Sequence, residues 1–147
     1  MIPHSTALKG IVAGLHHVAI VVESIEKARL VYESAFGMGG GGDVEFVPDQ
    51  KVRVLVVHAG TQRIELVEPA SPDSPVTGFL AKRGPGLHHL AYKVHDIEAA
   101  IAACKAAGLR MIDEKPRPGA HHCRIAFVHP SATGGVLSEL VEEPKAH

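Results

Sequence analysis

The chain has 147 residues, 46% of them hydrophobic and 21% charged, which suits one compact domain with a buried core. A net charge of −1 gives no field that would attract nucleic acid, and no apolar run approaches the roughly 20 residues that cross a bilayer. Two cysteines without a CxxC spacing, Cys104 and Cys123, argue against a disulfide framework and favour a reducing, cytoplasmic location.

The first part of the chain predicts a strand, a helix and three further strands. Residues 15–22 alternate between two apolar sets, as in a strand that is covered on both faces. Ser24 is placed to cap a helix that ends near Phe36, and Gly37 stands in the usual position after a helix. The three strands that follow are predicted at 44–47, 52–58 and 62–67.

The same order of elements begins again after a segment rich in Pro, Ser and Gly, which we expect to hold one short helix at 76–82. A strand starts at Leu87, and Asp96 is placed to cap a helix that Gly108 ends. The later elements are a helix at 97–107 and strands at 109–112, 124–128 and 136–141. The fold class is therefore α+β, with the order βαβββ twice.

These two halves are copies of one unit. Residues 15–28 align without a gap with residues 87–100, sharing the Leu-His-His start, and Glu-Leu-Val-Glu occurs at both 65–68 and 139–142. We expect a single domain over residues 1–147, in which two modules and a linker pack with pseudo-twofold symmetry around a concave sheet. The modules are predicted at about 14–69 and 87–143, with the linker at about 70–86.

Four repeated side chains predict a metal site on that concave sheet. His17 shares a strand face with the small Ala19, and the same spacing recurs at His89, while Glu65 and Glu139 each stand inside an apolar strand. A carboxylate buried in this way is normally paired or bound to a metal. Two imidazoles and two carboxylates suit Co, Zn, Ni or Mn, with coordination positions left open for a substrate.

Each of these residues also has a plainer interpretation. A single strand histidine is more often a packed core residue, and a mid-strand glutamate often lies on a solvated edge. The repetition of all four in register favours the metal site over that alternative. For His16 and His88, which precede the two ligand histidines, we expect only packing or contacts behind the ligands.

The paired modules with His and Glu at these places resemble the vicinal oxygen chelate superfamily, and within it the methylmalonyl-CoA epimerase family, from His17 to Glu142. The linker, the second His-His strand and the His-Pro…Gly-Gly loop carry the closest resemblance. They read ELVEPASPDSP at 65–75, FLAKRGPGLHHLA at 79–91 and HPSATGGVLSEL at 129–140.

The resemblance implies a metal-dependent isomerase of propionate metabolism that interconverts (2R)- and (2S)-methylmalonyl-CoA by removing and returning the C2 proton through a metal-stabilised enolate. It implies the ligands His17, Glu65, His89 and Glu139, an acyl-CoA substrate and a homodimer, with Glu139 and Glu65 as candidate catalytic residues. Some members of the family carry a second basic glutamate where this chain has Val54, and they tend to have Gln at the position of Glu65.

Two other functions stay open at this point. A glyoxalase I-type lactoylglutathione lyase would use the same four ligands on a hemithioacetal of glutathione. A non-catalytic binding protein of the same superfamily would need no metal.

Overall fold

The computed structural model describes residues 11–40 and 42–145; both ends of the predicted domain, residues 1–10 and 146–147, lie outside this part, as does Gly41. The chain divides into two compact units. We call His17–His89 the N-terminal unit and the described residues 11–16 and 90–145 the C-terminal unit, and each is described by itself. The boundary falls inside β1 and β5, so each of these strands contributes residues to both units. The prediction of a single domain stays a prediction.

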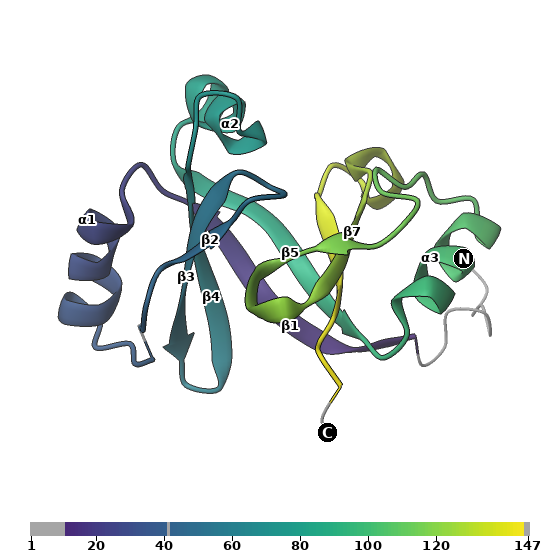
Figure 1. Cartoon of the computed structure of the whole chain (residues 1–147), viewed down its shortest axis with the longest axis horizontal. Coiled ribbons are helices and arrows are strands. Elements are labelled where there is room, and N and C mark those ends of the chain that lie inside the picture. Colours follow the sequence, from purple (N-terminus) through teal and green to yellow (C-terminus); the bar gives the residue numbers. More distant parts are fainter. Residues whose placement is uncertain (1–10, 41, 146–147) are drawn as a thin grey trace. The chain divides into compact units, whose positions relative to one another are not determined.

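The N-terminal unit contains four strands in the order β2-β3-β4-β1, labelled in Figure 1. β1 pairs with β4 in parallel, and the other neighbours are antiparallel. The strands are β1 (Val12–Val21), β2 (Glu45–Val47), β3 (Val52–Ala59) and β4 (Gln62–Pro69). The helices are α1 (Ile25–Arg29), which continues as a π-helical turn over Leu30–Ala35, and α2 (Pro75–Arg83).

Alternation along these strands sorts the side chains onto two faces. Leu55, Val57 and Leu66 are buried on the face that packs against Ile25 of α1, which lies beside β4 (Figure 1). The opposite face carries His17 and its neighbours on β1. The hydrophobic contact with α1 thus fixes the register that turns His17 away from the helix.

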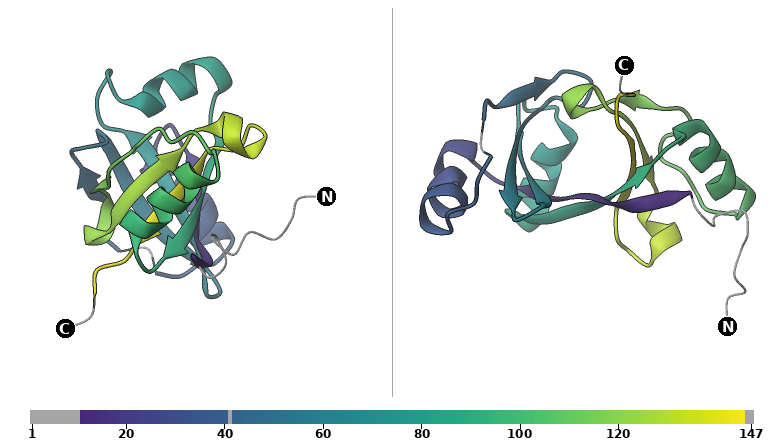
Figure 2. Two further views of the ribbon diagram at one scale, coloured as in Figure 1. Left: turned by 90° about the vertical axis from the view of Figure 1, so that its right-hand side faces the viewer. Right: turned by 90° about the horizontal axis from the view of Figure 1, so that it is seen from below.

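The C-terminal unit repeats this plan with the strand order β5-β8-β7-β6, in which β5 and β8 are parallel. α3 (green in Figure 2) covers one face, where Val94, Ile97, Ile101 and Leu140 are buried together. The strands are β5 (Gly86–Val94), β6 (Arg117–Pro118), β7 (Arg124–Val128) and β8 (Ser138–Glu142). The helices are α3 (Ile97–Ala106) and two 3₁₀ turns, Ala120–His122 and Pro130–Thr133.

The predicted order βαβββ and the α+β class are confirmed, and so are the helix starts. The Ser24 hydroxyl accepts a hydrogen bond from Lys27 N, and the Asp96 carboxylate accepts one from Ala99 N. Gly108 follows α3 with a φ of +83°, the left-handed conformation that ends helices. Among the described residues, no helix is long and apolar enough to cross a membrane.

One predicted strand is wrong. Residues 109–112 form only an isolated bridge, at Met111, and β6 at Arg117–Pro118 is the strand that pairs with β7. The Asp113 carboxylate accepts the hydrogen bond from Phe127 N, so a side chain takes the place of a backbone carbonyl beside β7. The apolar run at 109–112 therefore meets β7 without forming a ladder. The last strand also begins at Ser138, two residues after its predicted start.

In each unit, a glutamate near the end of β4 or β8 accepts a hydrogen bond from the backbone N–H of the first residue of a helix. In the N-terminal unit, Glu68 accepts a hydrogen bond from Ile25 N at 3.1 Å and pairs with Arg53 of the adjacent strand. In the C-terminal unit, Glu142 accepts from Ile97 N at 2.8 Å and pairs with Arg124. Both carboxylates lie at the positive end of a helix dipole. The duplication thus repeats this contact as well as the backbone.

Candidate metal centre

His17 lies in the middle of β1 and points to the face opposite α1. It is 5% exposed, and Ala19 and Val21 on the same face are fully buried. The predicted parity of the strand is therefore correct. Because Ala19 ends at its Cβ, it leaves space beside the imidazole on a face that is otherwise lined by larger side chains.

Glu65 comes to the same face through the pairing of β4 with β1. Its backbone lies directly opposite Ala19 on one side and Val56 of β3 on the other. The side chain is 12% exposed, and its Oε2 lies 3.5 Å from His17 Nε2. A carboxylate between two apolar neighbours is stable only with a charged or hydrogen-bonding partner, which His17 supplies here.

His89, on β5, completes the cluster within the N-terminal unit. Its Nε2 lies 3.2 Å from His17 Nε2, and the two rings meet edge to face with centroids 5.3 Å apart. One ligand atom from each of His17, Glu65 and His89 lies within 4.8 Å of the others. The structure thus brings together three of the four residues that the repeat singled out.

The spacing of these atoms fits a shared cation. Bonds of about 2.0–2.2 Å to nitrogen and oxygen, at angles between octahedral and tetrahedral, place neighbouring ligand atoms about 3.0–3.5 Å apart. The two measured separations, 3.2 Å from His17 to His89 and 3.5 Å from His17 to Glu65, lie in that range. Two nitrogen donors with one oxygen donor, nearly enclosed by protein, suit a borderline divalent ion.

Glu139 occupies the equivalent register in the C-terminal unit. It lies on β8, 4% exposed, directly opposite Ala91 of β5 and Phe127 of β7. Glu65 has the matching neighbours Ala19 and Val56. Because the small alanine and the carboxylate recur in the same cross-strand pair, Glu139 is the counterpart of Glu65 in its own unit. Its role as a fourth ligand beside His17, Glu65 and His89 stays a prediction.

The profile of the glyoxalase/bleomycin resistance protein/dioxygenase superfamily matches residues 16–127, which include three of the four predicted ligands. The chain belongs to this superfamily. The predicted vicinal oxygen chelate fold, which unites glyoxalases, dioxygenases and antibiotic-resistance proteins, is thereby confirmed.

Within the superfamily, several of the similar proteins are named methylmalonyl-CoA epimerase. The mitochondrial methylmalonyl-CoA epimerase of Bos taurus is 39% identical over 127 residues, which are 86% of this chain and 72% of the bovine protein. The crystal structure of methylmalonyl-CoA epimerase from Mycobacterium tuberculosis has a TM-score of 0.87 at 35% identity, with 99% of this chain and 94% of that one covered. A methylmalonyl-CoA epimerase in complex with methylmalonyl-CoA and NH4+ has a TM-score of 0.83 at 30% identity, covering 90% and 95%. The predicted resemblance to the epimerase family is confirmed.

The position at which the resemblance implies a second glutamate in some family members is apolar here. Val54 is 2% exposed and lies opposite Val67 of β4 on the face that holds Glu65. On its other side, Val54 is paired with Glu45 of β2. The Glu45 carboxylate is therefore one strand away from Val54. The sequence alone did not reveal this neighbour, because the pairing of β2 with β3 had to be known.

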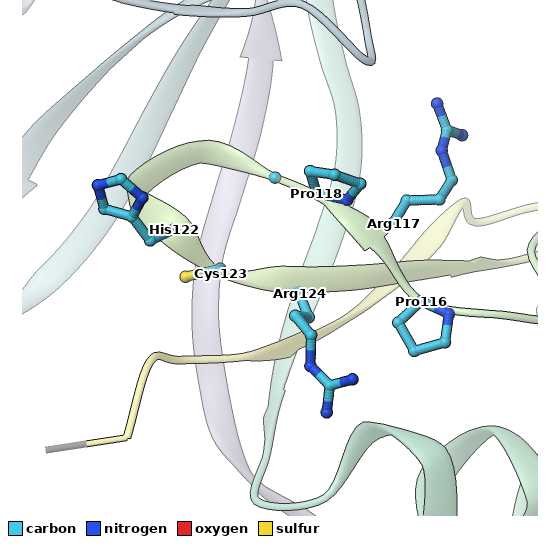
Figure 3. Close-up of a pocket in the computed structure, with 7 residues that line it drawn as sticks. Pro116, Arg117, Pro118, His122, Cys123 and Arg124 are labelled. Atoms are coloured by element: carbon cyan, nitrogen blue, oxygen red, sulfur yellow. The ribbon is translucent and has the colours of Figure 1, made fainter.

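A pocket of about 450 Å³ lies around the β6–β7 hairpin (Figure 3). The residues that line it are distant in sequence from His17, Glu65 and His89. Arg117 and Arg124 line it but point away from each other (Figure 3), and each is paired with a carboxylate. The Arg124 guanidinium lowers the pKa of Glu98, and its own pKa is raised by Glu98 and Glu142. The two arginines therefore do not form a joint anion site in this pocket.

A second set of carboxylates, Asp96, Glu98 and Glu142, lies close together at the start of α3. Arg124 and the first N–H groups of the helix donate hydrogen bonds to these carboxylates. The three acidic residues therefore have a structural role. Cys104 lies on α3 and is buried in the core, and burial raises the pKa of its thiol. This residue is thus a small apolar core residue.

Proposed function

We propose that this chain is a methylmalonyl-CoA epimerase, an isomerase that interconverts the (2R) and (2S) forms of its acyl-CoA substrate. The observation that carries the proposal is the convergence of His17, His89 and Glu65 in a chain whose relatives are named for this reaction. The complex of a similar epimerase with methylmalonyl-CoA supports the assignment of the substrate class.

The cation in this proposal is divalent, Co, Zn, Ni or Mn, and its ligands are His17, Glu65, His89 and Glu139. When bound, it supplies Lewis-acid stabilisation of the negative charge that develops on the thioester oxygen. The buried imidazoles would bind the cation through ring nitrogens, and the β1 and β5 backbones fix their position. The carboxylates would contribute negative charge beside the cation.

Inversion at C2 needs one group to take a proton from one face and another to return a proton to the opposite face. We assign these tasks to Glu65 and Glu139, whose matching registers place them as counterparts in the two units. One carboxylate accepts the C2 proton as the C–H bond breaks, and the electron pair is delocalised into the thioester. The other, protonated, returns a proton to the carbon.

Incubation with (2S)-methylmalonyl-CoA in D2O tests the reaction. The metal-loaded protein is expected to produce (2R)-methylmalonyl-CoA with deuterium at C2, whereas lactoylglutathione formation from methylglyoxal and glutathione would support the glyoxalase alternative. Retention of stoichiometric metal after dialysis separates both enzymes from a metal-free binding protein. Wild-type protein that gives no deuterium uptake with any of the four metals would overturn the assignment.

The resemblance also implies a homodimer, and the cysteine usage favours a cytoplasmic location. Sedimentation equilibrium of the purified chain, at concentrations on both sides of 1 μM, tests the homodimer by its mass. A purely monomeric species throughout would remove this part of the proposal.

A further inference from the structure

His88, which precedes the ligand histidine on β5, makes an unusual contact with it. His88 Nδ1 lies 2.8 Å from His89 Nδ1, and the two rings are nearly perpendicular, at 77°. Consecutive side chains of a strand normally point to opposite faces. A hydrogen bond between the rings of two consecutive residues is therefore unusual in a strand. This hydrogen bond reaches His89 on the nitrogen that does not face His17.

A side chain of α2 holds the His88 ring from the other side. The rings of Phe79 and His88 meet edge to face with centroids 4.9 Å apart, and the Arg83 guanidinium lies 5.9 Å from the centroid of Phe79. Both contacts have the geometry that aromatic and cation–aromatic pairs prefer. α2 itself is fixed at its start by the buried Ser74, which caps it. A continuous line of contacts therefore runs from α2 to the metal cluster.

The hydrogen bond determines which nitrogen of each ring carries a proton. An imidazole that donates its Nε2 lone pair to a cation, and is neutral, carries its proton on Nδ1. The Nδ1–H group of His89 must then donate to His88 Nδ1, which therefore carries no proton. His88, when neutral, consequently has its proton on Nε2. In the opposite arrangement, His89 would carry its proton on Nε2, between itself and His17, and could not bind a cation there.

The first copy of the repeat places a different group beside its first histidine. His16 occupies the position equivalent to His88, but its Nε2 lies 3.3 Å from Glu143 Oε1. His88 instead has the ring of Phe79 packed on it, from α2, which lies between the two copies in the chain.

We propose that His88 is a positioning residue that fixes His89 in the Nδ1–H tautomer, and that Phe79 holds His88 in place for this purpose. The inference rests on the proposed metal site but not on the identity of the substrate. In metal enzymes the acceptor of a ligand histidine's second N–H is usually a carboxylate, a backbone carbonyl or water. Here the acceptor is a second imidazole, that of His88.

Long-range ¹H–¹⁵N spectra of the Zn²⁺-loaded protein read the tautomers directly. His89 is expected to carry its proton on Nδ1 and His88 on Nε2, and a His88 proton on Nδ1 would overturn the proposal. Co²⁺ titration, followed by the visible absorption of the bound ion, measures the affinity. His88→Ala is expected to weaken binding about 10- to 100-fold, as the loss of such a contact does elsewhere.

Two further variants separate positioning from a general loss of structure. His88→Asn keeps an acceptor near the Nδ1 position and is expected to restore most of the affinity, while Phe79→Leu keeps an apolar side chain without the ring and is expected to lose part of it. His95→Ala is the matched control. His95 is exposed and directly follows β5, so this variant should bind Co²⁺ as tightly as wild type does. Equal affinities of wild type and His88→Ala would refute the role of His88.

The outcomes also distinguish this inference from the proposed function. Tight Co²⁺ binding by wild type that weakens in His88→Ala supports the positioning role even if no epimerase activity is found. If wild type binds no divalent cation, both proposals fail.

Discussion

Removing the carboxylate of Glu142 is expected to destabilise the protein considerably more than removing its counterpart Glu68. Glu142 has a side chain that is 10% exposed, and it accepts a hydrogen bond of 2.8 Å from the first N–H of α3. A hydrogen bond to a charged group contributes about 1.5–3 kcal/mol, and the half-exposed Arg124 adds at most about 1 kcal/mol. Glu142→Ala should therefore lower the free energy of unfolding by about 3 kcal/mol.

The same contact in the N-terminal unit is weaker. The Glu68 side chain is 21% exposed, its hydrogen bond from Ile25 N is 3.1 Å long, and its pair with Arg53 is 3.4 Å apart. We expect Glu68→Ala to lower the free energy of unfolding by about 1–2 kcal/mol, because solvent already competes for the carboxylate.

Urea denaturation followed by circular dichroism gives the free energies for both variants and for a control, Glu143→Ala. Glu143 is adjacent to Glu142 but 32% exposed, and it contacts His16 and Lys93 at the surface. The control should change the free energy of unfolding by no more than about 0.5 kcal/mol. If Glu142→Ala is no less stable than Glu143→Ala, the capping of α3 by a strand glutamate does not stabilise the fold, and the reasoning is refuted.

Three further results are expected. Glu139→Gln should reduce epimerase turnover at least about 100-fold, equivalent to roughly 2.7 kcal/mol of barrier, with unchanged circular dichroism; near-normal turnover would exclude Glu139 as an acid–base group. Hydrogen bonds from Lys51 and Ser71 lower the pKa of Asp73 to about 2, so its contribution to stability is complete above the unfolded pKa near 4 and is lost as the pH falls towards 2. Acid titration of Asp73→Asn should lack this component, and identical curves for variant and wild type would contradict it. Burial raises the pKa of Cys104, so its alkylation at pH 8 should be far slower in the native protein than in urea, and equal rates would show that the thiol is accessible.

The local signals in the sequence predicted most of the fold because each of them has a direct structural consequence. Ser24 and Asp96 cap helices through their own side chains, and the alternation around His17 correctly indicated which face of β1 it occupies. The strand at 109–112 was predicted as the counterpart of the strand at 44–47 in the first copy. Whether an apolar run forms a ladder depends on its partner, and the Asp113 carboxylate occupies the N–H of β7 that a strand would need.

The candidate site was predictable to the extent that it is repeated. His17, Glu65 and His89 were found because the duplication placed the same residue types in the same strand positions. A contact of His88 behind its ligand was expected, and the hydrogen bond to His89 is one. The ring of Phe79 that packs on His88 was not predictable, since it comes from a helix outside the repeat. Glu68 and Glu142 stood in the repeated Glu-Leu-Val-Glu sequence, but only the fold reveals that each caps a helix.

The most direct test of the metal centre is the position of the ion itself. Crystals grown with Co²⁺ and measured at the cobalt absorption edge would locate it by anomalous scattering. We predict one peak within bonding distance of His17 Nε2, His89 Nε2 and carboxylate oxygens of Glu65 and Glu139. A peak bound elsewhere, or a Glu139 carboxylate more than about 6 Å from the ion, would contradict the four-ligand site.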